Sequence, residues 1–308
     1  MRYKYVTCDV FTARRFGGNQ LAVLPDARGL SDAQMLAVTR EFGYSESVFV
    51  FPPEDGGTRK VRIYTPGGEV PFAGHPTVGC AIVLAHVGLV TLASGRGRVV
   101  LEEGVGHVPV SLRMSVDPSA PTGAAAFAQF TTAMLPERGP EPPSIETIAE
   151  FLSLAPEDLV GGDWSPEGMT CGLPFLLVPV RDRDAVRRAR PRVELLERAL
   201  KGWWTEMVLV FSRDPEHGGA GARARMFAPS IDVPEDPATG SAAAALAGYL
   251  AARDERADGT LAWTIEQGYE MGRPSQIEVE AERAAGQLTA VRVGGSAVIV
   301  AEGEIEVE

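Results

Sequence analysis

The chain has 308 residues, a formal net charge of −12, 45% hydrophobic residues and 23% charged residues. This composition is typical of a globular protein, and the length is enough for two domains that each bury a core. The negative charge argues against nucleic acid or an anionic membrane surface as a partner. The three cysteines and four histidines have no metal-ligand spacing. We therefore expect no metal and a reducing, cytoplasmic location.

The first residues contain no signal-peptide apolar core, and residues 1–12 alternate as a strand does. Two strands are predicted, at Val6–Phe11 and Leu21–Leu24. A helix is then predicted from Ser31, because Ser31 and Gln34 form a capping-box pattern ahead of an apolar face. Gly43 is expected to end that helix.

A hairpin follows this helix. Val48–Phe51 is a continuous apolar run, and the turn at 55–57 (Asp-Gly-Gly) leads back into a second strand at Lys60–Tyr64. The apolar run at 78–92 that comes later contains His86 and Gly88 and is short for a membrane span. We interpret it as a buried helix.

The sequence writes one segment twice. Residues 62–84 (RIYTPGGEVPFAGHPTVGCAIVL) align with residues 225–246 (RMFAPSIDVPEDPATGSAAAAL). Each copy runs from a strand-like stretch through a Gly/Pro-rich turn into an apolar helix. Further blocks correspond in the same order, namely 45–46 with 205–206 and 101–104 with 265–268. The pattern predicts duplication of a whole domain.

Two domains are predicted from this repeat. The first comprises residues 1–118 together with a returning tail at about 294–308, and the second comprises residues 119–293. A Pro-rich, acidic stretch at 134–144 resembles a linker.

The two helix starts are candidate anion-binding sites. Pro76 stands where a first helical residue would stand, and Thr239 or Ser241 is able to cap the other helix. A helix start offers unpaired N–H groups that attract a carboxylate or an enolate oxygen. Two such starts predict a cleft with an anion-binding end on each wall, whereas two ordinary capped core helices are the alternative.

Three ionisable residues near these starts are able to move a proton. Glu46 opens a strand, and a partly desolvated carboxylate there would have a raised pKa and act as a base near neutral pH. His75 stands at the first helix start, and Asp236 precedes the second. The residues alone are also compatible with Glu46 as a solvated residue at the end of a strand. The repeat has Glu206 in the corresponding place, so a glutamate there can be inherited for structural reasons.

The helix starts lack the two facing cysteines that a cofactor-free racemase commonly uses. Ala73 and Thr239 occupy those positions, and Cys80 lies inside the helix as a core residue. A proton moved by one base is therefore favoured over inversion by two bases.

Five motifs together resemble the PhzF-like proteins of phenazine biosynthesis, which share the diaminopimelate epimerase fold. The motifs are GNQLAVL, SESVFV, YTPGGEVPFAGHPTVG, EDPATGSAAAAL and EQGYEMGRPS. The similarity runs along nearly the whole chain and is weakest in the linker and at 180–205. It implies an α+β fold of two pseudo-symmetric domains, each a curved or barrel-like, mostly antiparallel sheet around a central helix.

The resemblance also implies a function. It implies an isomerase without metal or organic cofactor, similar to trans-2,3-dihydro-3-hydroxyanthranilate isomerase, acting on a small carboxylate-bearing substrate as a homodimer. The implied catalytic residues are Glu46 as base, with His75 and Asp236. The expected substrate-binding residues are Ser45, Gly74, Thr239, Gly240 and Ser241.

Two other functions stay open at this point. One is an amino-acid epimerase or racemase on the same fold, which would exchange and invert a chiral α-carbon. The other is a non-catalytic protein that binds small acids in the same cleft.

Overall fold

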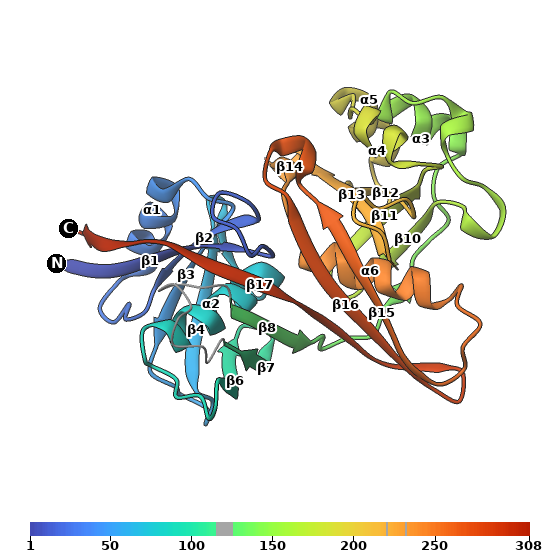
Figure 1. Ribbon diagram of the computed structural model, residues 1–308. Coiled ribbons are helices and arrows are strands. Elements are labelled where there is room, and N and C mark those ends of the chain that lie inside the picture. The colour runs from blue at the N-terminus through green and yellow to red at the C-terminus, as the bar shows by residue number, and fades with distance from the viewer. Residues whose placement is uncertain (115–125, 220, 232) are drawn as a thin grey trace. The chain divides into compact units, whose positions relative to one another are not determined.

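The computed structural model describes residues 1–114, 126–219, 221–231 and 233–308 (Figure 1). Its internal contacts divide the chain into two compact units, Met1–Ala133 with Gly294–Glu308, and Met134–Val293. The predicted boundary at 118/119 lies outside the described residues. Residues 126–133, which we had assigned to the second domain, group with the first unit because the strand at 126–131 pairs with an earlier strand of that unit.

The first unit is built on a sheet that closes on itself. Its strands are β1 (Arg2–Val10), β2 (Asn19–Leu24), β3 (Glu46–Phe51), β4 (Arg59–Thr65), β5 (Gly68–Val70), β6 (Arg96–Glu103), β7 (Gly106–Arg113), β8 (Ala126–Thr131) and the later part of β17 (Gln287–Glu306). Neighbours pair in the order β17–β1–β2–β3–β4–β6–β7–β8, and β8 returns to β17. The β2–β3 and β4–β6 pairs are parallel, and the β1–β17, β1–β2, β3–β4, β6–β7 and β7–β8 pairs are antiparallel. Because β8 pairs with β17, the sheet is closed and barrel-like.

The second unit repeats this order of pairing. Its strands are β9 (Glu137–Arg138), β10 (Glu167–Thr170), β11 (Pro174–Pro179), β12 (Val208–Ser212), β13 (Gly221–Ala228), β14 (Val233–Asp236), β15 (Gly259–Gln267) and β16 (Ser275–Ala284). The β11–β12 and β13–β15 pairs are parallel, as are their counterparts in the first unit. The β10–β11, β9–β10, β12–β13, β13–β14 and β15–β16 pairs are antiparallel.

Each sheet surrounds one central helix, α2 (Gly74–His86) in the first unit and α6 (Gly240–Ala251) in the second (Figure 1). Almost every residue of both helices is buried, which is the pattern of a helix that is apolar all round and enclosed. A Cβ on Gly79 would stand 2.5 Å from a methyl of Leu21 and 2.7 Å from one of Val10. Gly79 therefore lets α2 approach β1 and β2 closely.

The peripheral helices are α1 (Asp32–Phe42), α3 (Ile145–Leu152), α4 (Arg183–Arg188) and α5 (Val193–Leu200), with short 3₁₀ turns η1 (Pro156–Asp158), η2 (Gly162–Trp164), η3 (Pro229–Ile231) and η4 (Tyr269–Met271). Three of the four peripheral helices, α1, α3 and α4, have a capping side chain at their start, and α5 has none. Ser31 and Gln34 form the predicted capping box, and Gly43 ends α1 with a φ of 64°. The predicted hairpin of β3 and β4 is also confirmed.

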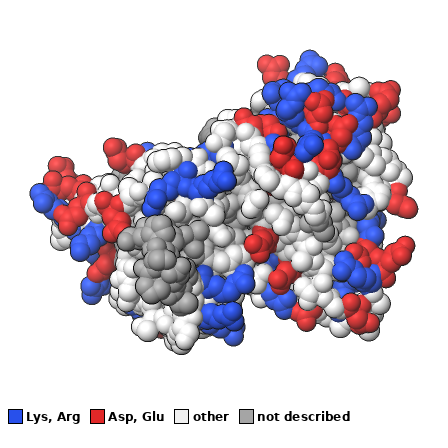
Figure 2. All heavy atoms as spheres, viewed as in Figure 1, with Lys and Arg blue, Asp and Glu red and all other residues white. Residues whose placement is uncertain are grey.

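The helices α3 and α5 pack together over strands β11 and β12 as a second core of this unit. On the face shown in Figure 2, acidic and basic side chains are interspersed, most densely over the region of α3, α4 and α5. No helix among the described residues is long and apolar enough to cross a membrane.

Candidate active site

Glu46 is the first residue of β3, beside Leu21 of the parallel strand β2. Its side chain is 19% exposed, and the Oε2 atom is buried at 3.5 Å from Nε2 of His75. Burial raises the pKa of Glu46 to about 7, and a contact with the Ser45 hydroxyl partly opposes the shift. Both protonation states of Glu46 are therefore accessible near neutral pH.

His75 is the second residue of α2, and its side chain is 5% exposed. Its Nδ1 lies 3.3 Å from the amide nitrogen of Asn19, whose Oδ1 accepts a hydrogen bond of 3.2 Å from Ser45 Oγ. In this arrangement the amide nitrogen donates, so Nδ1 is the acceptor and the proton of neutral His75 sits on Nε2. The ring thus presents an N–H group to Glu46.

The start of α2 has no side-chain cap. The N-cap residue is Ala73, with extended backbone, and Gly74 is the buried first helical residue. Ser31, Ser144 and Asp182 accept first-turn N–H groups in the peripheral helices α1, α3 and α4. Pro76 is the third helical residue rather than the first, since the helix already begins at Gly74. It is tolerated there because first-turn N–H groups have no partner within the helix.

The start of α6 differs in its side chains. Asp236 ends β14, and Thr239, one of the two predicted capping residues, is the N-cap residue. The Thr239 hydroxyl makes no hydrogen bond to the first turn of the helix, however; it donates to Asp236 Oδ2 at 2.5 Å. Gly240 and Ser241 are the first two helical residues. The first turn of α6, like that of α2, has no capping side chain.

Gln267, the last residue of β15, holds this start together. Its amide nitrogen donates to the Asp236 carbonyl at 2.7 Å and to Thr239 Oγ1 at 3.0 Å. Its oxygen accepts from the Thr239 backbone N–H at 3.2 Å. Asp236 and Thr239 are thereby fixed relative to the helix.

The structure brings the predicted residues together in two groups, one in each unit. Ser45, Glu46, Gly74 and His75 gather at the start of α2, and Asp236, Thr239, Gly240 and Ser241 at the start of α6. The sequence interpretation missed Asn19 and Gln267. Asn19 stands within the GNQLAVL motif, and Gln267 ends a repeated block, so both lay in segments already singled out.

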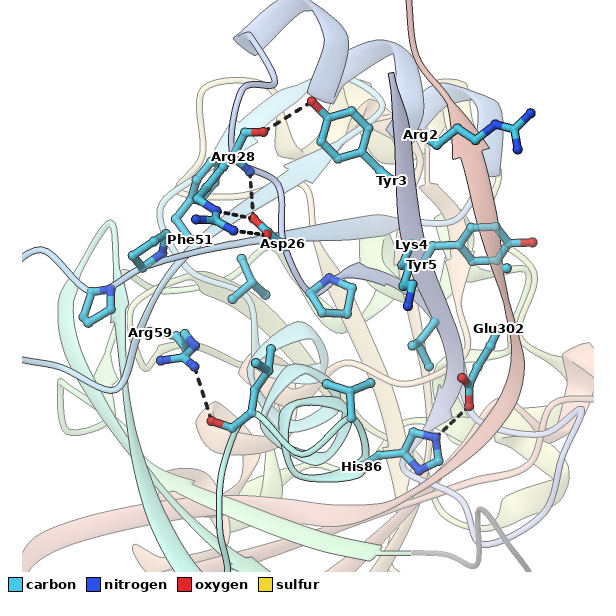
Figure 3. A pocket seen from close by; sticks show the side chains of 18 residues that line it. Arg2, Tyr3, Lys4, Tyr5, Asp26, Arg28, Phe51, Arg59, His86 and Glu302 are labelled. Carbon is cyan, nitrogen blue, oxygen red and sulfur yellow. Dashed lines mark hydrogen bonds and ion pairs between the residues drawn. The ribbon is translucent and has the colours of Figure 1, made fainter.

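An open cavity of about 1040 Å³ lies elsewhere in the first unit (Figure 3). Its walls include Arg28 paired with Asp26, and His86 paired with Glu302 at 2.7 Å. His86 is the last residue of α2, about 16 Å along the helix axis from His75 at a rise of 1.5 Å per residue. None of the candidate residues lines this cavity.

Comparison with known proteins places the chain in a family. The family model of phenazine biosynthesis-like proteins, PhzC-PhzF, matches residues 8–303. The chain is 40% identical to an uncharacterized isomerase of Mesorhizobium japonicum, with 98% of each chain covered. It is 34% identical to trans-2,3-dihydro-3-hydroxyanthranilate isomerase of Pseudomonas fluorescens, covering 98% of this chain and 99% of that one.

A solved structure shares the fold. The crystal structure of a phenazine biosynthesis protein of the PhzF family from Bacillus anthracis matches with a TM-score of 0.88 over 99% of both chains, at 23% identity. The predicted α+β class, with barrel-like sheets around helices, is therefore confirmed, and the fold is that of diaminopimelate epimerase-like proteins. Fold and relatives define an isomerase. The chain belongs to the phenazine biosynthesis-like family, PhzC-PhzF.

Proposed function

We propose that this isomerase moves a proton on a small carboxylate-bearing substrate, with Glu46 as the only base and no metal or organic cofactor. The observation that carries the proposal is the setting of Glu46, whose buried Oε2 lies 3.5 Å from His75 and whose pKa is raised to about 7. A base with a pKa near the operating pH balances availability against proton affinity. Glu46 takes a proton from one carbon and returns it to another.

His75 assists this transfer in the proposal. Its Nε2–H group faces Glu46. This group donates to the Glu46 carboxylate or to the substrate, on which negative charge develops as the proton leaves. The separation of 3.5 Å is longer than a hydrogen bond, and such contacts often tighten only when substrate binds. Asp236, held by Thr239, serves in orientation and protonation.

The substrate carboxylate is assigned to the start of α6. The first-turn N–H groups there have no capping side chain, and the Ser241 hydroxyl adds a further donor. The helix dipole favours an anion at this end. Ser45, Gly74, Thr239 and Gly240 complete the proposed binding residues.

The relatives support a substrate class. The 34% identical relative is named trans-2,3-dihydro-3-hydroxyanthranilate isomerase. We therefore propose a substrate of similar chemistry, a small unsaturated acid with an acidic C–H bond. The homodimer and the cytoplasmic location stay predictions, the first open to test by light scattering of the purified protein.

A racemase with two bases is less well supported. The N-cap residues of the two central helices are Ala73 and Thr239, neither of which ionises near neutral pH. Cys80 is buried within α2, and burial raises its pKa well above the ordinary value. The N-cap positions of the two central helices therefore supply no pair of bases.

The test is hydrogen–deuterium exchange into a panel of cyclic and acyclic carboxylic acids, followed by NMR in deuterated buffer. The wild-type protein is expected to exchange one C–H position and to isomerise that acid. Glu46→Gln should lose both activities with an unchanged circular dichroism spectrum. Glu206→Gln, altered at the corresponding position of the repeat, is the matched control and should exchange normally.

Two outcomes would count against the proposal. Full exchange by Glu46→Gln would remove Glu46 from the role of base. Saturable binding of an acid by the wild-type protein with no exchange at any carbon would favour the non-catalytic alternative, and exchange with inversion at a chiral α-carbon would favour an epimerase.

A further inference from the structure

A second carboxyl group lies against α2, outside the residues assigned so far. Glu103 ends β6 and is 7% exposed. Its Oε1 atom lies 2.9 Å from the Thr77 hydroxyl, and its buried Oε2 atom has no hydrogen-bond donor among the described residues. A buried carboxyl with so few donors is costly to ionise.

The hydrogen bonds around Thr77 indicate which group carries the proton. Thr77 Oγ1 is also 2.8 Å from the carbonyl of Ala73, the residue four positions earlier. A helical threonine ordinarily donates its hydroxyl proton to that carbonyl. Since a hydroxyl has only one proton, its contact with Glu103 is then a hydrogen bond donated by a protonated carboxyl group.

The surroundings of Glu103 favour the same state. The thiol of Cys80 in α2 is close enough to interact electrostatically with Glu103, and it interacts in turn with the thiol of Cys8 in β1. Burial raises the pKa of both thiols, so they are neutral. Glu103 takes part in no ion pair within the described ranges 1–114, 126–219, 221–231 and 233–308. Burial raises the pKa of Glu103 to about 8.

The sequence repeat supplies an independent comparison. The residue that corresponds to Glu103 in the second unit is Gln267, an amide that cannot ionise. It too ends a strand and donates to a threonine hydroxyl at a central helix start, that of Thr239. A protonated Glu103 is the carboxylic counterpart of this amide donor.

The neighbouring position behaves differently. Glu102 accepts three backbone hydrogen bonds, from Glu54, Asp55 and Gly57, and these lower its pKa. Its counterpart Glu266 likewise accepts from the backbone of Glu216 and His217. In both units, then, the first position of the pair accepts from a loop, and the second contacts a threonine hydroxyl at a helix start.

We propose that Glu103 is a positioning residue for proton transfer, held as a neutral acid that donates to Thr77 and so ties β6 to the start of α2. Thr77 in turn donates a hydrogen bond to the Ala73 carbonyl, and His75 lies between these two residues in the helix. The catalytic part of this inference rests on the proposed function, while the protonation of Glu103 does not.

Ionisation of Glu103 would reverse the hydrogen bond. A carboxylate accepts only, so Thr77 would have to turn its proton from the Ala73 carbonyl toward Glu103. The helix start that carries His75 would then lose the hydrogen bond from the Thr77 hydroxyl to the Ala73 carbonyl. Turnover should therefore rise with pH as Glu46 ionises around pH 7 and fall again as Glu103 ionises around pH 8.

The protonation state is testable without any substrate. Infrared difference spectra of Glu46→Gln, in which Glu46 no longer contributes, should contain the carbonyl band of a buried protonated carboxyl at pH 6.5. The band should titrate away above about pH 8 and be absent from the Glu46→Gln/Glu103→Gln double variant. The titration in Glu46→Gln stands even if the double variant does not fold. Absence of the band at pH 6.5 would overturn the proposal.

The positioning role is tested by pH profiles of kcat. Glu103→Gln keeps a donor, so its kcat below pH 7 should fall by no more than about threefold and its alkaline decline should disappear. Thr77→Val removes the tie and should lower kcat about tenfold with a smaller change in KM. Glu102→Gln, the matched control, should keep the alkaline decline.

The outcomes separate the two proposals. An alkaline decline that persists in Glu103→Gln would overturn the positioning role. Unchanged kcat in Thr77→Val would do the same. If Glu46→Gln still turns over, the proposed function fails, but the infrared titration of Glu103 is unaffected.

Discussion

The starts of α2 and α6 share a backbone plan and differ in chemistry. Both follow a strand and a turn, and neither has a capping side chain. Around α2 stand the ionisable groups His75, Glu46 and Glu103, two of them with pKa values raised by burial. Around α6 stand hydroxyls and an amide, with Asp236 already bonded to Thr239. A repeated scaffold thus exposes N–H groups twice, while Glu46 and Glu103, whose pKa values burial raises, both lie at the start of α2.

The largest expected effect is on stability and concerns the desolvated base. Because the pKa of Glu46 is raised to about 7, the native state holds a proton that the unfolded state has lost above its ordinary value of 4.5. The stabilisation is complete below pH 4.5 and is lost as pH rises through 7. Glu46→Gln should therefore be more stable than wild type at pH 8, by up to about 3 kcal/mol, and similar at pH 4.

Urea denaturation at both pH values measures this difference. Equal stability of the two proteins at pH 8 would mean that Glu46 is well solvated. Glu206→Gln, altered at the corresponding position, retains Glu46 and serves as the control; it should lose stability between pH 4 and pH 8 as the wild type does.

The second prediction tests the contrast between the two helix starts directly. His75 and Ser241 are each the second residue of a central helix. His75→Ala should lower kcat about 100-fold, since it removes a proton donor beside the base. The protein should remain folded by circular dichroism. A loss smaller than threefold would remove the distinction between a catalytic and a binding start.

The third prediction concerns the residue that orients the imidazole. Asn19→Ala should lower kcat about tenfold, because His75 then loses the contact that fixes its tautomer. The ¹⁵N shifts of the His75 ring should report a mixture of tautomers in the variant and mainly Nε2–H in the wild type. An unchanged tautomer in Asn19→Ala would contradict this role.

The smallest expected effect lies at the start of α6. Ser241→Ala should raise KM by about fivefold and change kcat little, because one hydroxyl donor to the carboxylate is lost while the backbone N–H groups remain. Initial-rate kinetics separate the two constants. A fall in kcat as large as that of His75→Ala would show that both starts act on the reacting atoms.

Much of the fold was predictable because local signals agreed with one another. The capping box at Ser31, the left-handed Gly43 and the hairpin of β3 with β4 all follow from short patterns. The order of the repeat carried over to the second unit, with parallel pairs β2–β3 and β11–β12 in matching places. The predicted positions of Glu46 at a strand start and of His75 at a helix start are confirmed.

The missed residues reach the site only through tertiary contacts. Asn19 is 56 positions from His75, and Gln267 is 28 positions from Thr239, so no local pattern joins them. Thr239 or Ser241 was expected to cap α6, but the Thr239 hydroxyl instead donates to Asp236 and accepts from the Gln267 amide. The partners of this hydroxyl depend on the folded backbone, which the sequence pattern does not contain.

The last strand has a consequence for biosynthesis. In β17, residues 297–306 pair with β1, yet the whole of the second unit is translated between these two partners. The first barrel therefore cannot close until the ribosome has synthesised the second unit, and one edge of β1 stays unpaired until then. Exposed strand edges of nascent chains are prone to mispairing. Slow synthesis, or a stall within the second half, should leave the edge of β1 open to chaperones and to aggregation for longer.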